Sequence, residues 1–337
     1  MINLSECEIA SNWDYSKPYV SIFAIAYNHI EFIEACLDSI LEQKTNFPFE
    51  LIIHDDSSID GTEAVIREYE EKFPNIIKAI YEIENQFQKG VDFISDIIYP
   101  VSKGKYVAIC ECDDRWCNSN KLQMQFDYLE THNNCSMCTH NTLRHNLLNG
   151  NETKFNNWEQ SFSMSEEQIL FGWNVHTSSY FMRRELAFTD VNLRYWFGDY
   201  IMLTLAMSSG MVWYFPEIMS VYNFNNGHGV TYKNLSNKNR IIEKESLRTE
   251  YLNKYNAITK YRFNNIVKER IEYNNIYIMM LKAEQNLTYA DYKRLKISIK
   301  ENRNGWKRLF TKKLKLQISN YLVFRLIEYY KRMKNEQ

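Results

Sequence analysis

Acidic residues directly follow two short apolar runs, and this feature constrains the fold more than any other. The apolar runs are 106–110 and 49–54, followed by Glu111, Asp113 and Asp114 in the first case and by Asp55 and Asp56 in the second. Short apolar runs of this kind are typical of buried strands. Open α/β sheets bind ligands at the carboxyl ends of their strands. The sequence therefore predicts two acidic turns along one edge of one sheet.

Adjacent carboxylates at such an edge repel one another unless a cation lies between them. Mg²⁺ and Mn²⁺ prefer oxygen ligands, and they commonly hold the phosphates of a substrate at the same time. The acidic turns therefore predict a site for Mn²⁺ or Mg²⁺ that also binds a diphosphate.

The chain before residue 133 alternates between strand-like and helix-like segments. Strands are expected at Tyr19–Ala26, Phe49–His54, Ile76–Glu82 and Tyr106–Cys110, and helices from Asn28, from Asp60 to Phe73, from about Val91 to Val101 and from Asn118 to Thr131. Asn28 with Glu31, and Asp60 with Glu63, have the spacing of a helix-capping pair. Alternation of this kind predicts parallel strands joined by right-handed crossovers. The expected fold is α/β, with a Rossmann-like, mostly parallel sheet flanked by helices.

The regular alternation ends after Asn133. Further strands are expected at Ser136–Leu143, Ser178–Arg183 and Met211–Tyr222, with a helix near Phe197–Ser209. From Ser236 onward the sequence is rich in Lys, Glu, Tyr and Ile and contains no Pro, which favours helices. We therefore divide the chain into a main domain, residues 1–235, and a helical C-terminal region, residues 236–337.

Composition indicates a globular protein with reduced thiols. The 337 residues contain no run of 18 apolar residues, and Met1–Ser16 is acidic and polar rather than basic and then apolar. The seven cysteines are an odd number, as expected for free thiols in a reducing compartment. We therefore expect a cytoplasmic protein.

Positive charge gathers near the end of the sequence. Residues 303–337 contain ten Lys and Arg against Glu328 and Glu336, so this segment carries +8 while the remainder carries −10. Between Trp306 and Lys334 the basic residues alternate with Leu, Ile and Phe. This tail is expected either to pack on the main domain with a solvated basic face or to contact an anionic membrane surface. Nucleic acid is not an expected partner, because no binding motif accompanies the basic stretch.

A C-x-x-C pair, Cys135 and Cys138, lies near His132 and His140 and is compatible with zinc binding. The second pair that makes such spacing specific is missing. Cys138 also falls within a predicted strand. Structural thiols are therefore the favoured interpretation.

Four segments together resemble the family 2 glycosyltransferases, in order and in spacing. They are Val20–Asn28 (VSIFAIAYN), Cys36–Gln43 (CLDSILEQ), Phe49–Thr62 (FELIIHDDSSIDGT) and Lys103–Asp114 (KGKYVAICECDD), and the match extends over about residues 19–231. The resemblance implies a GT-A fold, a nucleotide-sugar donor, a divalent metal and inversion at the anomeric carbon. It makes residues 19–133 the nucleotide-binding half and residues 134–235 the acceptor half of the main domain.

The same resemblance assigns roles to residues of the first half. The nucleotide-binding residues are Ala26, Tyr27, Asn28, Asp56 and Asp113, with Tyr27 stacking on the base and Asp56 accepting a hydrogen bond from uracil N3–H. Asp114 is assigned to the metal. Glu111 stands in place of the usual first Asp of the metal motif and is predicted to contact the acceptor or the sugar. Taken alone, each acidic pair could instead be a solvated turn or a helix cap.

In the second half, Phe197-Gly198-Asp199-Tyr200 resembles the acceptor-site motif of the family, which makes Asp199 the catalytic base. A helix cap is the alternative for Asp199. The segment 219–230 resembles the terminal loop of the family, so His228 is assigned to the metal or the diphosphate, while Asn223 stands where Arg is frequent. Trp173 and His176 are expected to contact sugar, since sugar faces stack on aromatic rings, or to pack a loop.

These assignments predict an inverting transferase that moves a hexose or N-acetylhexosamine from a UDP-sugar to a saccharide acceptor. A lipid-linked acceptor in bacterial surface polysaccharide synthesis fits the family. One alternative is a sugar-nucleotide nucleotidyltransferase, although residues 26–29 lack the Gly-rich, basic loop expected there. The other is a carbohydrate-binding or scaffold module without activity.

Overall fold

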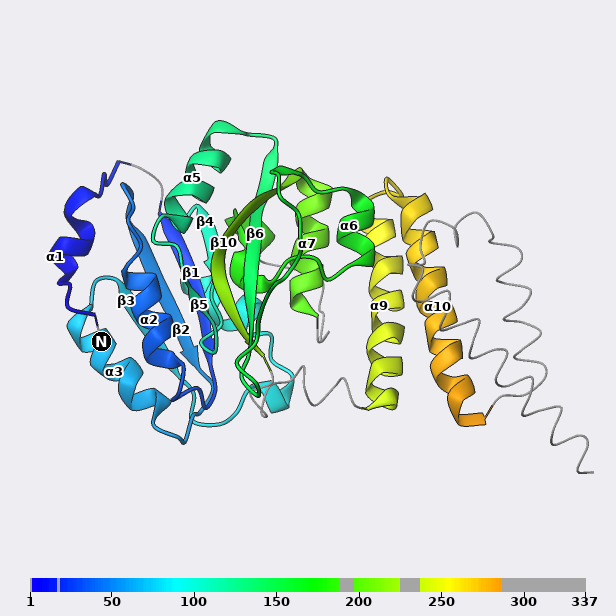
Figure 1. Cartoon of the computed structure of the whole chain (residues 1–337), viewed down its shortest axis with the longest axis horizontal. Helices are drawn as coiled ribbons and strands as arrows, with labels where there is room; N and C mark the ends of the chain where they lie inside the picture. Colours follow the sequence, from blue (N-terminus) through cyan, green and yellow to red (C-terminus); the bar gives the residue numbers. More distant parts are fainter. Residues whose placement is uncertain (1, 17–18, 188–196, 225–236, 287–337) are drawn as a thin grey trace, which may run out of the picture.

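A ten-stranded mixed sheet forms the centre of the molecule (Figure 1). The computed structural model describes residues 2–16, 19–187, 197–224 and 237–286. The strands are β1 (Val20–Ala26), β2 (Phe49–Asp55), β3 (Ile77–Tyr81), β4 (Tyr106–Ile109), β5 (Arg115–Trp116), β6 (Cys135–Asn146), β7 (Glu152–Lys154), β8 (Phe162–Ser163), β9 (Phe181–Arg183) and β10 (Met211–Phe224).

The strand order is β3-β2-β1-β4-β9-β6-β10-β5, with β7 pairing with β6 and β8 pairing with β10. Strands β3, β2, β1 and β4 are parallel neighbours. Strand β9 is antiparallel to both β4 and β6, so β6 runs in the same direction as β1. Strand β10 pairs parallel with β6. The ends of β1, β2, β4, β6 and β10 therefore share one edge of the sheet, which we call the carboxyl edge.

Helices cover both faces of the sheet. They are α1 (Glu6–Ile9), α2 (Ile33–Leu41), α3 (Thr62–Lys72), α4 (Tyr99–Val101), α5 (Lys121–Thr131), α6 (Glu166–Phe171), α7 (Gly198–Ser209), α9 (Lys238–Ile258) and α10 (Asn264–Asn286), with a π-helical segment at Phe93–Ile98 before α4. Figure 1 shows α6, α7, α9 and α10 on the opposite side of the sheet from α2 and α3. The predicted α/β class with a helical C-terminal region is confirmed.

Two apolar clusters, one on each face, hold these layers together. One contains buried residues of α2, α3 and α5, such as Leu37, Ile66 and Phe126. The other contains buried residues of α7 and α9, such as Ile201 and Leu252. Full burial of one such side chain contributes about 1.5–3 kcal/mol. Because α9 shares a cluster with α7, the start of the C-terminal region packs directly on the main domain; its boundary at residue 235 stays a prediction.

Several predicted element starts differ from the structure. Asn28 does not cap a helix: α2 begins at Ile33, after an N-cap residue, Phe32, whose side chain makes no capping bond. Asn28 instead has a φ of 55°, and its side-chain oxygen accepts a hydrogen bond from the Ile59 N–H at 2.9 Å. The strand expected from Ser178 begins only at Phe181, because Thr177–Ser179 form a 3₁₀ turn.

Candidate active site

The residues Glu111–Asp114, which we call the acidic turn, lie at the carboxyl edge beside β1. The backbone N–H of Cys112 still donates to the Ile25 oxygen at 3.1 Å, and the chain then turns as the Asp114 N–H donates to the Glu111 oxygen at 2.9 Å. Strand β5 follows and pairs with β10. Glu111, Asp113 and Asp114 each offer one carboxylate oxygen within 4.8 Å of the others. The predicted convergence of carboxylates is therefore present.

Asp114 is buried, and only one of its two carboxylate oxygens is hydrogen bonded. Its Oδ1 accepts the backbone N–H of Asn223, the next-to-last residue of β10, at 3.0 Å. The Asn223 side chain donates to the Asp113 backbone oxygen at 2.8 Å, so β10 holds the acidic turn at two points. The other carboxylate oxygen of Asp114, Oδ2, has no hydrogen-bond partner and lies 3.5 Å from Nδ1 of His176.

His176 does not neutralise this oxygen. Burial lowers the pKa of His176 to about 3, so the imidazole is neutral at physiological pH. Its Nδ1 accepts the backbone N–H of Ser178 at 3.3 Å. The ring is 3% exposed and stacks on Tyr222 with centroids 4.1 Å apart. This packing makes His176 part of the wall of the site.

Burial makes the negative charge of the acidic turn unfavourable. Burial first, and then Asp113 and Asp199, raise the pKa of Glu111 to about 8. Burial also raises the pKa of Asp113, and it raises the pKa of Asp114 together with its acidic neighbours. A divalent cation relieves such repulsion and supplies the partner that Asp114 Oδ2 lacks. Three hard oxygen donors suit Mn²⁺ or Mg²⁺, so the residues fit the metal predicted from the sequence.

Asp199 lies at the amino end of α7. It is the second residue of α7, whose N-cap residue is Phe197, and its Oδ1 accepts the Tyr200 N–H at 2.8 Å. The Tyr180 hydroxyl donates to the Asp199 backbone oxygen at 3.4 Å. The charge of Asp199 contributes to the raised pKa of Glu111, so the two carboxylates interact electrostatically although they are far apart in sequence.

Of the residues predicted to bind the nucleotide, Ala26 ends β1, Tyr27 and Asn28 follow it, Asp56 follows β2, and Asp113 belongs to the acidic turn. Tyr27 is 42% exposed, so its ring is available for stacking. Asp56 is buried, and its two oxygens accept the backbone N–H groups of Gln86 at 2.6 Å and Phe87 at 3.2 Å. Each carboxylate oxygen can accept a second hydrogen bond. The uracil contact of Asp56 stays a prediction.

Trp173 is 49% exposed and contacts the ring edges of Phe155 and Tyr222, with centroids 5.0 Å and 5.9 Å away. The sugar contact predicted for Trp173 stays a prediction. His228 and the basic tail after Trp306 lie outside the described residues. Cys135 and Cys138 are free, buried residues of β6.

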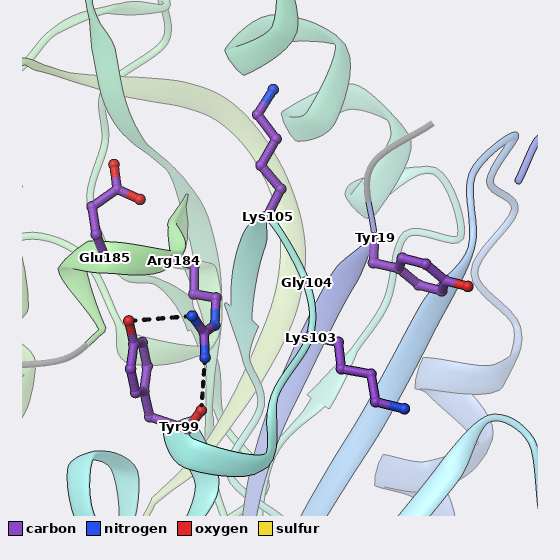
Figure 2. Close-up of a pocket in the computed structure, with 7 residues that line it drawn as sticks. All are labelled: Tyr19, Tyr99, Lys103, Gly104, Lys105, Arg184 and Glu185. Atoms are coloured by element: carbon purple, nitrogen blue, oxygen red, sulfur yellow. Dashed lines mark hydrogen bonds between the residues drawn. The ribbon is translucent and has the colours of Figure 1, made fainter. Parts of the chain in front are cut away.

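A cavity of about 440 Å³ lies at the opposite edge of the sheet (Figure 2). Tyr19 and Lys105, which precede β1 and β4, line it together with Arg184, which follows β9. Figure 2 shows the Arg184 guanidinium against Tyr99, to whose backbone oxygen it donates at 3.0 Å. Gly104 forms part of the cavity wall, and a Cβ added to this glycine would lie 2.4 Å from Ser21 N. None of the predicted site residues lines this cavity.

The mostly parallel sheet with an acidic turn at its carboxyl edge defines a GT-A-type α/β fold. A model of the family "Glycosyl transferase family 2" matches residues 21–186. The chain belongs to glycosyl transferase family 2.

Relatives agree with this assignment. An uncharacterized protein of Mycobacterium tuberculosis is 28% identical over 226 residues, which cover 66% of this chain and 64% of the relative. The putative teichuronic acid biosynthesis glycosyltransferase TuaG of Bacillus subtilis is 34% identical over 35% of this chain and 44% of its own length. The chain thus spans less than two thirds of the relatives it matches. The crystal structure of S. aureus TarS 1–349 is similar in fold, with a TM-score of 0.52 and 15% identity over 84% of this chain and 91% of that one.

Three site residues were not predicted from the sequence. Asn223 clamps the acidic turn, Tyr180 contacts Asp199, and His29 lies close enough to Asp113 to oppose the rise of its pKa. The Asn223 contact spans 110 residues of sequence. The loop motif that contains Asn223 does not predict this contact, and the pairing of β5 with β10 brings Asn223 to the turn.

Proposed function

We propose that the protein is a metal-dependent, inverting glycosyltransferase that moves a hexose or N-acetylhexosamine from a UDP-sugar to a saccharide acceptor. The observation that carries this proposal is the convergence of three buried or half-buried carboxylates, one with an unpartnered oxygen, at the carboxyl edge of the sheet. Asp199 interacts electrostatically with this group. A binding module without activity has no need for a carboxylate opposite a metal site.

The names of relatives support the donor and the process. WfaP of Escherichia coli, 34% identical over 33% of this chain and 41% of its own length, is named a UDP-Glc:alpha-D-GlcNAc-diphosphoundecaprenol beta-1,3-glucosyltransferase. The name of TuaG refers to teichuronic acid, a surface polymer. We therefore place the reaction in bacterial surface polysaccharide synthesis, with a lipid-linked acceptor.

The proposed reaction is a single in-line displacement. Asp199 accepts the proton of an acceptor hydroxyl while the hydroxyl oxygen bonds to the anomeric carbon, and the bond from that carbon to UDP breaks with its electron pair leaving on the diphosphate. Asp113 and Asp114, with Glu111 beside them, would hold Mn²⁺ or Mg²⁺, which when bound neutralises charge on the departing UDP. Tyr27 and Asp56 bind and orient the uridine.

The site must also be reached by its acceptor. No helix in the described parts of the chain has the length and apolar character needed to cross a bilayer. We propose that the protein works at the inner face of the cell membrane, with the basic tail after Trp306 contacting anionic lipid.

A thermal-shift panel followed by a UDP-release assay tests the function. We expect UDP-sugars, but not GDP-sugars, to raise the melting temperature in the presence of Mn²⁺, because in the proposed site Asp56 accepts the uracil N3–H. UDP release should then require both Mn²⁺ and a saccharide acceptor. Stabilisation by GDP-sugars alone, or release that persists in EDTA, would contradict the proposal.

A further inference from the structure

Asp199 lies in the first turn of α7, and this end of the helix has no side-chain cap. The N-cap residue, Phe197, makes no capping hydrogen bond. The first N–H groups of a helix have no partners within the helix, so helix ends fray unless other groups hold them. The orientation of the Asp199 carboxylate therefore depends on contacts from outside α7.

Tyr200, the residue after Asp199, is held by two other helices. Its hydroxyl donates to the backbone oxygen of Leu170, in α6, at 3.2 Å. The guanidinium carbon of Arg248, in α9, lies 5.1 Å from the ring centroid of Tyr200 and 5.4 Å from that of Phe197, within the range of a cation–π contact. Because Oδ1 of Asp199 accepts the Tyr200 N–H at 2.8 Å, the position of Tyr200 also fixes that of the carboxylate.

Arg248 is fixed in turn by buried charges. Its Nη1 is 2.6 Å from Oε1 of Glu245, and Oε2 of Glu245 is 3.7 Å from Nη2 of Arg270, in α10. Glu245 and Arg270 are 8% and 6% exposed. The guanidinium carbon of Arg270 also lies 5.5 Å from the ring of Phe171, the last residue of α6. We call Glu245, Arg248 and Arg270 the charge cluster. A buried ion pair adds little net stability, because desolvation offsets its attraction, so orientation of the contacted rings is the more consistent role.

We propose that the charge cluster positions the Asp199 carboxylate for proton transfer. The inference rests on the proposed function, in which Asp199 is the base, and it adds residues that lie outside the family match at 21–186. The cluster acts through Phe197 and Tyr200, on either side of Asp199, so its members are positioning residues. Proton transfer depends on the distance from base to proton, and a displacement of about 1 Å can cost about 10²-fold in rate.

Two arginines that contact opposite ends of α7 test this role. Arg248→Met removes the cation at the amino end, and we expect kcat to fall at least about tenfold while calorimetry shows unchanged affinity for UDP with Mn²⁺. Arg248→Lys keeps a charge for Glu245 and should recover most of the lost rate. Arg262 is the matched control, because its Nη1 donates to the oxygen of Ser208, near the carboxyl end of α7, at 3.1 Å. Arg262→Met should leave kcat near that of the wild type.

A double-mutant cycle separates positioning from a general loss of packing. Asp199→Asn leaves no base to position, so adding Arg248→Met to it should cause little further loss of kcat. Tyr200→Phe is a milder variant for the same cycle, because it keeps the ring and loses only the hydrogen bond to Leu170. Equal losses with and without Asp199, or an unchanged kcat in Arg248→Met, would overturn the role of the charge cluster. A wild-type protein that releases no UDP from any UDP-sugar and saccharide would instead refute the proposed function.

Discussion

Metal binding should release protons, and the raised pKa of Glu111 sets the contribution of this residue. With a pKa of about 8, Glu111 is about 90% protonated at pH 7 in the metal-free protein. Its ordinary value is 4.5, and a bound cation favours the charged form, so Mn²⁺ expels this proton. Glu111 alone should therefore release about 0.9 proton per metal ion at pH 7.

The direction of the pH effect follows from the same shift. Between pH 4.5 and about 8 the metal-free protein holds a proton that the metal-bound protein lacks. Affinity for Mn²⁺ should therefore rise with pH through this window, about tenfold per unit for one proton, and level off above it. The stability that the protonated carboxyl gives the metal-free fold is complete below pH 4.5 and is lost as the pH rises toward 8.

Calorimetry in buffers of different ionisation enthalpy measures the proton count, because the apparent binding enthalpy changes with buffer enthalpy in proportion to the protons released. Glu111→Gln keeps the shape of the side chain and should lower the count by about one. A wild-type slope of zero, or a slope that Glu111→Gln leaves unchanged, would refute the reasoning that burial keeps this carboxyl protonated.

Four further changes test the other assignments. Asp114→Ala should abolish Mn²⁺-dependent UDP binding while the fold persists, as followed by calorimetry and circular dichroism; unchanged affinity would remove Asp114 from the metal site. Asp56→Ala should weaken UDP and UDP-sugar binding alike, by about tenfold, through the lost uracil contact. Selective loss of sugar preference would contradict that assignment. Asp199→Asn should keep donor affinity and lower turnover by about 10²-fold or more, because an amide accepts no proton at neutral pH; a near-normal rate would exclude the base role. Deletion of residues 306–337 should reduce salt-sensitive binding to anionic vesicles, and equal binding by the shortened chain would count against membrane contact.

The positions of β1, β2 and β4 could be predicted because each depends on local sequence. The apolar runs that became β1, β2 and β4 are buried on both faces, as in most parallel sheets, and no local turn residue interrupts them. The location of both acidic turns at the same edge of the sheet then followed from parallel pairing alone. For the same reason the convergence of Glu111, Asp113 and Asp114 could be predicted without knowledge of the second half.

Prediction was wrong where a distant contact competes with a local signal. Asn28 and Glu31 have capping spacing, but the Asn28 N–H donates to Ser58 Oγ at 2.9 Å, and its side chain binds the Ile59 N–H. These bonds hold Asn28 in the left-handed region and delay the start of α2. At His176 the competing contact is local: its Nδ1 accepts the Ser178 N–H, which closes a 3₁₀ turn where a strand was expected.

The clamp between Asn223 and the acidic turn has a consequence for biosynthesis. Residues 113 and 114 leave the ribosome long before residue 223, and at about 5–20 residues per second the wait is several seconds or more. Until β10 pairs with β5 and β6, the Asp114 carboxylate lacks the hydrogen bond from the Asn223 N–H and is not yet enclosed by β10. A nascent chain ending near residue 186, where the family match stops, should therefore have a sheet edge but no competent cation site. Metal binding would then become possible only once the sheet is complete. During that interval the edge of β6 would be exposed and accessible to a chaperone.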